Sequence, residues 1–323
     1  MIINAPGFHR MDAATYHADP CPAPSLSSSI ARVLVEKTPR HAWSQHVRLN
    51  PQPEEVSSKA MDLGSVAHEL VLGKGGGFAV LDFPTFATKA AKEAREEARD
   101  AGLVPILAHA MAEAQEIAQA VRRRVAKIAE CETLFQPGQG HAETCVFWQD
   151  DGGTWCRTML DWTDATGTVI TDLKLTGKGI DDEALRRKIS GGDDIQMGFA
   201  LRGMHILRPE LAERVKWRWC FVESEPPYEC RVVEADNTTM TMGAKRAAYA
   251  VELWRQCMAS NHWPGYPARI ERLEYAPWAE ARWIEREMND PVAANANTIL
   301  PSAARESNGL VWGDFPVKAE DAT

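Results

Sequence analysis

The sequence predicts a mixed α/β fold with a central sheet that is flanked by helices. Helical patterns fill the first part of the chain, at least three strand patterns follow from Glu143, and a helix, two strands and a long helix complete the order. β-Branched and aromatic runs indicate strands, whereas apolar residues three or four positions apart indicate helices. Because three strands follow one another directly, we expect a largely antiparallel central meander.

Five helical patterns precede the strands. Most of them carry apolar residues on one face, and proline or glycine marks several of their ends. Residues 1–24 show no clear period, so we expect an irregular lead-in there. The predicted helices are a helix that Ser25 opens, a short helix with Pro39 in its first turn, and helices over residues 59–72, 88–100 and 108–130.

The second half of the chain alternates between strands and helices. Periodicity is lost beyond Pro277-Trp278, and residues 286–323 are predicted to be a polar, partly disordered tail. The predicted strands cover residues 143–148, 155–162, 168–174, 215–223 and 228–234, and the predicted helices cover residues 195–206 and 239–260.

Composition restricts the class of protein. A chain of 323 residues with 45% hydrophobic content can bury a sizeable core. The net charge of −9 does not by itself indicate a nucleic-acid partner, although a protein that binds nucleic acid needs positive potential only along one groove. Seven scattered cysteines without a C-x-x-C pair exclude a zinc ribbon and suggest thiols in a reducing cytoplasm. No apolar run is long enough to span a membrane, so we expect a cytoplasmic protein.

The segment from Trp155 to Lys174 is predicted to form a β-hairpin that brings charged groups together. A turn between Thr166 and Gly167 would place Asp161 opposite Asp172. Asp172 and Lys174 would share one face, because side chains alternate along a strand. Two carboxylates and an ammonium group suit Mg²⁺ chemistry at a phosphate. The alternative is a solvent-exposed hairpin with ordinary surface charges.

Two further features lie in and after the helix over residues 59–72. His68 follows Gly64 by four positions and therefore lies on the same helix face. A lone histidine in such a helix is more often a core residue than a ligand. The Gly73–Gly77 segment, GKGGG, lacks the strand–GxxxxGK[ST]–helix context of a phosphate loop, so we interpret it as a flexible turn.

Several short motifs follow one another along the chain. They are SLSSS at 25–29, TPRHAW at 38–43, LGSVAHELVL at 63–72, CRTMLDW at 156–162, TDLKLT at 171–176, IQMGFA at 195–200, VESEPPY at 222–228 and WPGY at 263–266. In this order they resemble the nuclease domain of the RecE family, the exodeoxyribonuclease VIII group of the PD-(D/E)XK superfamily. The resemblance covers roughly residues 15–283 and implies a PD-(D/E)XK exonuclease domain over residues 25–285 with a restriction-endonuclease-like core.

The resemblance implies roles for the residues of the hairpin. Asp161 and Asp172 would bind Mg²⁺, or Mn²⁺ in its place, with help from the backbone carbonyl of Leu173. Lys174 would act on the attacking water.

It also implies roles for residues outside the hairpin. His68 would lie beside the metal, as a ligand or through a water, which reverses the interpretation from helix periodicity alone. Gln196 would position the scissile strand or Lys174. Glu143 is either a further acidic contributor to the metal site or a charged residue at a strand end. The family commonly has tyrosine four positions after the glutamine, whereas this chain has Ala200, so an aromatic contact is missing.

The activity implied by the resemblance is exonucleolytic degradation of linear double-stranded DNA from 5′ to 3′. The resulting 3′ single strands would serve a RecT-like annealing partner in phage recombination, and the enzyme would form a homo-oligomer of the ring-like kind that encloses DNA. Two alternatives stay open: a non-catalytic binding module that keeps the fold, and an endonuclease or repair nuclease of the same superfamily. Retention of Asp161, Asp172 and Lys174 together argues against the binding module.

Overall fold

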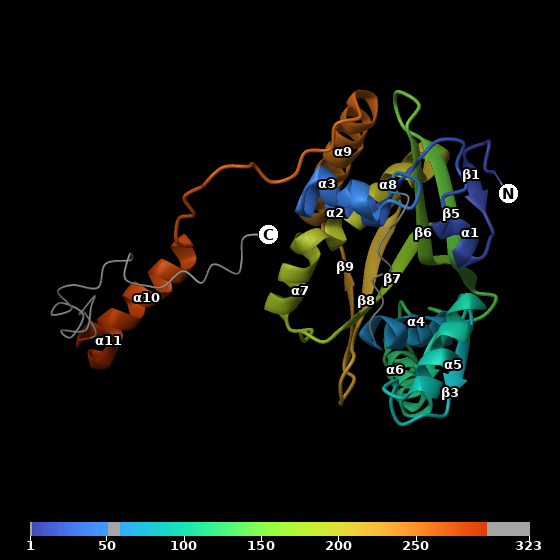
Figure 1. Ribbon diagram of the computed structural model, residues 1–323, viewed down its shortest axis with the longest axis horizontal. Helices are drawn as coiled ribbons and strands as arrows, with labels where there is room; N and C mark the ends of the chain where they lie inside the picture. The colour runs from blue at the N-terminus through green and yellow to red at the C-terminus, as the bar shows by residue number, and fades with distance from the viewer. Residues whose placement is uncertain (1, 51–58, 296–323) are drawn as a thin grey trace, which may run out of the picture. The chain divides into compact units, whose positions relative to one another are not determined.

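The computed structural model describes residues 2–50 and 59–295. The chain divides into two compact units, residues 1–266 and residues 267–323. The first unit contains a seven-stranded mixed sheet in the order β1-β5-β6-β7-β8-β9, with β2 pairing parallel to β6 (Figure 1). Its strands are β1 (Gly7–His9), β2 (Leu26–Ser27), β5 (Gly140–Gln149), β6 (Trp155–Asp164), β7 (Val169–Thr176), β8 (Lys216–Glu223) and β9 (Cys230–Glu234).

Helices cover both faces of this sheet. One layer consists of α2, α3, α8 and α9, and the other consists mainly of α4 and α6 (Figure 1). The helices of the first unit are α1 (Ala13–His17), α2 (Ser28–Glu36), α3 (Pro39–Gln45), α4 (Lys59–Leu72), α5 (Lys89–Asp100), α6 (Ala108–Val125), α7 (Asp182–Lys188), a π-helical turn (Ile189–Asp193), α8 (Asp194–Leu207), a short 3₁₀ turn (Pro209–Leu211) and α9 (Asn237–Ser260).

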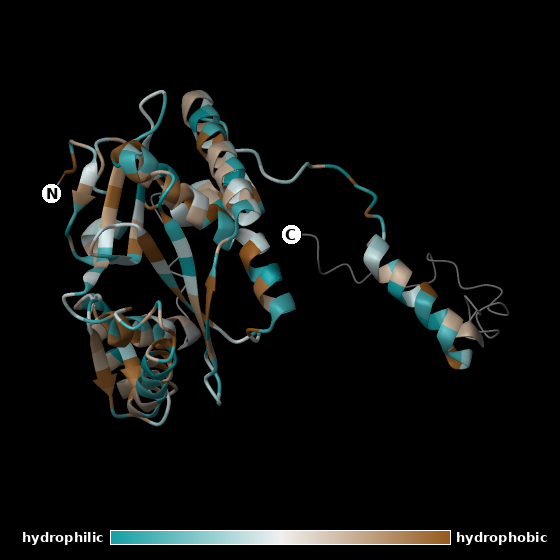
Figure 2. Ribbon diagram, turned by 180° about the vertical axis from the view of Figure 1, so that it is seen from behind, coloured by the Kyte–Doolittle hydropathy of each residue, from teal (hydrophilic) through white to brown (hydrophobic). Residues whose placement is uncertain are grey.

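The alternation of side chains along β8 shows why both layers form. Trp219 and Phe221 pack into a core cluster with α8 and α9, whereas Cys220 and Val222 pack into a second cluster with α4 and α6. A strand that is apolar on both faces is stable only when each face is covered. Hydrophilic and hydrophobic residues alternate along the helices, as Figure 2 shows. Each helix can therefore bury its hydrophobic side against the sheet and expose its hydrophilic side to water.

The predicted meander differs from the structure at one junction. β5, β6 and β7 are antiparallel neighbours, and β8 and β9 also pair antiparallel, but β7 and β8 run parallel. Parallel neighbours need a long crossover connection, and here α7 and α8 supply it. The polar segment after Lys174 therefore contains a helix, α7, that the sequence pattern did not predict.

The N-terminal segment is ordered by a buried charge, where the sequence predicted an irregular lead-in. β1 extends the sheet beside β5, and α1 follows it. The Asp19 carboxylate accepts hydrogen bonds from the backbone and hydroxyl of Ser25, at 2.9 and 2.6 Å, and lies 3.2 Å from the Arg157 guanidinium of β6. This contact attaches the start of β2 and α2 to the central sheet, and Ser27 rather than Ser25 caps α2.

Other differences are local. Residues 78–81 (β3) and 104–107 (β4) form a separate two-stranded parallel sheet beside α4 and α6, where no strand was predicted. In the second unit, α10 (Pro277–Asn289) and α11 (Pro291–Asn295) form helices beyond the point at which periodicity is lost. The rest of the predicted tail, residues 296–323, lies outside the described residues.

Across residues 2–50 and 59–295, none of the helices combines the length and apolarity needed to cross a bilayer.

We predict that the crossing of α8 and α9 does not tolerate a methyl group. A Cβ atom at Gly198 would lie 2.2 Å from the backbone of Gly243, so Gly198→Ala forces the helices apart and should lower the free energy of unfolding by about 3 kcal/mol in urea denaturation. Gly64→Ala in α4 is the matched control, because its Cβ meets nothing within 4 Å and should stabilise the protein by about 0.5 kcal/mol. Equal effects of the two substitutions would contradict the close crossing.

Candidate active site

β6 and β7 pair only near the turn that joins them. The register joins Trp162 to Thr171 and Thr163 to Ile170, which is the register predicted from the turn. Beyond these pairs β6 continues alongside β5 and β7 continues alongside β8, so the two strands separate. Asp161 and Asp172, the next opposed pair, therefore lie where the hairpin opens into a fork.

The Asp161 carboxylate occupies the opening of the fork. Its Oδ2 accepts a hydrogen bond from the Leu173 backbone N–H at 2.8 Å and lies 3.0 Å from His68 Nε2 on α4. A backbone N–H away from water needs an acceptor. Because β6 has separated from β7 at this point, the carboxylate replaces the carbonyl that a continued ladder would have offered.

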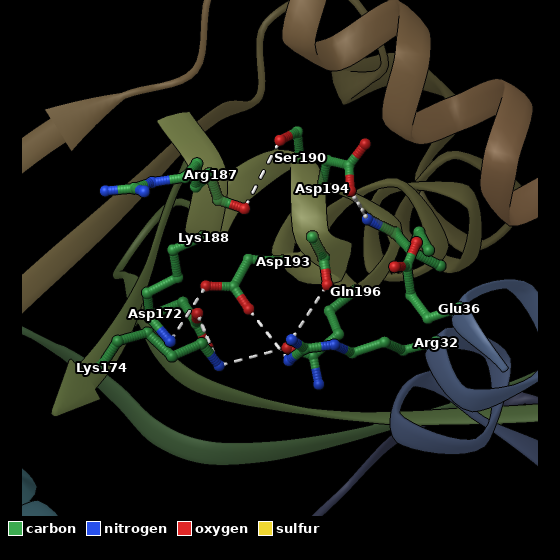
Figure 3. Close-up of polar contacts among 12 residues, drawn as sticks. Arg32, Glu36, Asp172, Lys174, Arg187, Lys188, Ser190, Asp193, Asp194 and Gln196 are labelled. Carbon is green, nitrogen blue, oxygen red and sulfur yellow. Dashed lines mark hydrogen bonds and ion pairs between the residues drawn. The ribbon is translucent and has the colours of Figure 1, made fainter. Parts of the chain in front are cut away.

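Asp172 and Lys174 project from one face of β7 toward α8. Lys174 Nζ donates to Asp172 Oδ1 at 3.1 Å and lies 2.9 Å from its Oδ2 (Figure 3). The same ammonium group donates to Gln196 Oε1 at 3.3 Å, in the first turn of α8. The fork thus brings together groups that contact helices in opposite layers: α4 through His68 and α8 through Gln196.

The electrostatics of the two carboxylates differ because their partners differ. Burial raises the pKa of Asp161, but the charge and hydrogen bond of His68, together with Lys174 and the Leu173 N–H, outweigh it and lower that pKa. Burial raises the pKa of Asp172, and the negative charges of Asp161 and Asp193 raise it further. Together these effects exceed the lowering by the ammonium group of Lys174, so the pKa of Asp172 lies above its usual value. Two carboxylates in one desolvated site repel each other in this way.

The cations of the site respond in the opposite sense. Burial lowers the pKa of Lys174, but Asp172, Asp161 and Asp193 together raise it above its usual value. Burial likewise lowers the pKa of His68, but the charge and hydrogen bond of Asp161, together with the charges of Glu143 and Asp172, raise it above its usual value. The carboxylates therefore favour the positively charged form of both side chains.

Glu143 lies on β5 opposite Asp161 of β6. The neighbouring pairs on either side are Ala142 with Trp162 and Thr144 with Leu160. Its backbone adopts the left-handed region, with φ of 47°, and its side chain is buried, which raises its pKa. Lys74 from the GKGGG segment donates to the Glu143 carbonyl at 3.1 Å and lies 3.5 Å from that of Ala142. Glu69 Oε2 accepts the Gly77 N–H at 2.9 Å. The segment predicted as a flexible turn is thus tied both to α4 and to the strained point of β5.

The residues present fit a divalent cation. Asp172 Oδ2 is buried, and within the described part of the chain it has the Lys174 ammonium group 2.9 Å away as an ion-pair partner but accepts no hydrogen bond of good geometry. Asp161 lies beside it with a second negative charge. No three His, Cys, Asp or Glu side chains in the described ranges form a preset metal cage. Mg²⁺ does not require one, because it is commonly held by one or two carboxylates and keeps several waters.

Sequence reasoning missed the residues that support this arrangement. Lys74 was visible only as a lysine between glycines, and Asp193 only as an acid three positions before Gln196. The structure buries Asp193 completely beside Arg32 and Lys188. Ala200, where the RecE family commonly has tyrosine, is buried in the core cluster of α8.

Comparisons with known proteins support this architecture. The family described as "PDDEXK-like domain of unknown function (DUF3799)" matches residues 28–276. A solved structure of a Eubacterium rectale protein assigned as an exonuclease is similar in fold, with a TM-score of 0.53, 11% identity, and coverage of 83% of this chain and 97% of that chain. A phage-related exonuclease from Haemophilus somnus gives a TM-score of 0.31 at 12% identity, covering 74% of this chain and 96% of that one, which is too slight to support an argument. No curated protein matches.

We predict that Lys74 stabilises the backbone beside Glu143. Lys74→Met removes a charged donor from a half-buried carbonyl, and the free energy of unfolding should fall by about 2 kcal/mol in urea denaturation. The control is Lys89→Met, whose side chain is 90% exposed and whose effect should stay within about 0.5 kcal/mol. If both variants unfold at the same urea concentration, the Lys74 contact contributes nothing.

Proposed function

This chain belongs to the family of PDDEXK-like domains, and from that membership we propose that it is a divalent-metal-dependent exodeoxyribonuclease acting on linear double-stranded DNA. The observation that carries the proposal is the fork between β6 and β7. There the carboxylates of Asp161 and Asp172 lie within one half-buried site, and Lys174 connects that site to Gln196. A binding module has no need to hold these charges together at the cost of their desolvation.

Asp161 and Asp172 would hold the cation, together with the carbonyl of Leu173. His68 and Glu143 lie beside them, either as further ligands or through a water. A divalent ion in this position supplies a water of lowered pKa and neutralises charge on the phosphate. We favour Mg²⁺, with Mn²⁺ as a substitute, because the donors are hard oxygens.

Lys174 has the geometry to act on the reacting phosphate. Its ammonium group has three N–H donors, and Asp172 and Gln196 take two of them. The third is left for the attacking water or for a phosphate oxygen, on which negative charge grows during hydrolysis. Gln196 would fix the direction of that donor through its own contact. In this proposal Gln196 positions Lys174 rather than reading the sequence of the DNA.

The finer features of the activity follow from the likeness to the RecE nucleases. We propose degradation from 5′ to 3′, which leaves 3′ single strands for a RecT-like annealing partner in recombination, and a homo-oligomer that encircles DNA. A cytoplasmic location goes with this proposal, because the seven cysteines are unpaired thiols.

We expect Asp172→Asn to abolish cleavage of linear duplex DNA in the presence of Mg²⁺ or Mn²⁺. The substitution removes one of two carboxylate charges, and a rate loss of about 1,000-fold corresponds to about 4 kcal/mol of transition-state stabilisation. Asp151→Asn in the exposed β5–β6 turn is the control and should leave the rate unchanged. EDTA should abolish cleavage by the unmodified protein.

A covalently closed circular duplex, assayed alongside, separates the candidate activities. Loss of linear DNA alone supports an exonuclease, whereas cutting of the circle identifies an endonuclease. If neither metal ion gives cleavage that depends on Asp172, the nuclease proposal is wrong and a binding module explains the fold better.

A further inference from the structure

A pocket of about 600 Å³ opens beside the candidate active site, between the end of β7, α2 and α7. Four cationic side chains line it, and no aspartate or glutamate is among its lining residues. Such a concentration of positive charge is unexpected on a chain whose net charge is −9. The four cationic residues are Arg32, Lys178, Arg187 and Lys188.

Two of these cations are fixed by one buried carboxylate. Asp193 is fully buried, with Oδ1 3.1 Å from Arg32 Nη1 and Oδ2 3.5 Å from Lys188 Nζ. Figure 3 shows Arg32 and Lys188 converging on Asp193 from different elements, α2 and the end of α7. A buried charge is stable only with partners, so Asp193 holds both cations at the pocket wall. Their outer N–H groups remain available, because Arg32 is 37% exposed and Lys188 is 27% exposed.

The glycines before Asp193 make room for Arg32. Arg32 Nη2 donates to the Gly191 carbonyl at 3.1 Å. Gly192 has φ of +120°, and a Cβ there would lie 2.5 Å from Arg32 Nε. A side chain at Gly192 would therefore be strained in backbone conformation and would displace the guanidinium group. In the Gly-Gly-Asp sequence of the π-helical turn, Gly191 and Asp193 thus accept hydrogen bonds from Arg32, and Gly192 leaves space for its side chain.

The other two cations are available to a ligand. Lys178 is exposed and forms no ion pair with any described residue. Arg187 lies 3.7 Å from Glu183, but both side chains are more than 70% exposed, and such pairs contribute little. Two acids, Asp193 beneath the wall and Glu183 beside Arg187, lie against four cations, which leaves the pocket with an excess of positive charge. Guanidinium and ammonium groups in this number match the oxygens of a phosphate.

The pocket borders the reacting groups. Thr176, which lines it, lies two positions after Lys174 and therefore on the same face of β7. Asp193, behind its wall, is three positions before Gln196, the partner of Lys174 Nζ. A nucleic-acid strand with one phosphate at Lys174 would bring a neighbouring phosphate close to the pocket.

We propose that this pocket binds a second phosphate of the DNA strand whose phosphodiester lies at Lys174. The inference rests on the proposed nuclease function and deepens it by assigning a separate phosphate subsite. The phosphate is either a monoester at the end of the strand or an internal diester, since both present the same charged oxygens. The subsite would fix how far the cleaved bond lies from that phosphate.

The test is a double substitution of the two exposed cations, Lys178→Gln with Arg187→Gln. Binding of a short blunt DNA duplex is measured by fluorescence anisotropy on the Asp172→Asn background, so that no strand is cut. We expect Kd to rise about tenfold. The slope of log Kd against the logarithm of the salt concentration should decrease by about one to two, which is one for each lost contact between a cation and a phosphate. The matched control is Arg186→Gln with Lys127→Gln, which removes two exposed charges outside the pocket and should change Kd by less than about twofold.

Duplexes with 5′-phosphate and 5′-hydroxyl ends distinguish the two sources of phosphate. A defect confined to the phosphorylated duplex identifies a terminal monoester, and an equal defect with both identifies an internal diester. If the pocket variant matches the control variant in Kd and salt dependence with both duplexes, the subsite does not exist. Cleavage by the unmodified Asp172 protein is assayed in parallel: cleavage without pocket dependence overturns only the subsite, and pocket-dependent binding without cleavage overturns only the nuclease function.

Discussion

Each of the two central strands is held by a different neighbour, and this pairing creates the site. β6 is hydrogen-bonded along its length to β5, and β7 is hydrogen-bonded along its length to β8. The two strands therefore stay together only beside their turn and then diverge. The divergence leaves the Leu173 N–H without a carbonyl from β6, and Asp161 takes its place. The same opening lets side chains from opposite faces of the sheet reach one another.

The charges in the site occur as half-buried or buried groups that stabilise one another. Asp161 has His68, Asp172 has Lys174, and Asp193 has Arg32 and Lys188. Carboxylates and cations alternate from α4 through the fork to the phosphate pocket. Because unpaired charges are costly in a desolvated site, removing one member would disturb its neighbours as well. Two carboxylates lie together at the fork, whereas cations outnumber acids at the pocket, which suits a metal at one and a phosphate at the other.

The backbone has a positive φ at two positions next to the charged side chains of the site, Glu143 and Gly192. Glu143 adopts a left-handed conformation on β5, and Lys74 binds its carbonyl. Gly192 adopts a positive φ that lets Arg32 cross the π-helical turn. Non-glycine residues in this region cost about 1 to 3 kcal/mol and persist only where surrounding contacts hold them. The Lys74 contact is such a support at Glu143.

The sequence by itself determined the local features of this protein. Turn residues set the register of the β6–β7 hairpin, and the helix over residues 59–72 has its predicted bounds, because both depend on neighbouring residues. Short motifs in order also indicated the nuclease fold. Only the tertiary structure decided that β7 pairs parallel with β8, that Lys74 reaches β5 and that Asp193 gathers Arg32 and Lys188. These contacts join segments far apart in the chain, and no residue pattern within either segment specifies which distant group will satisfy a buried charge or a strand edge.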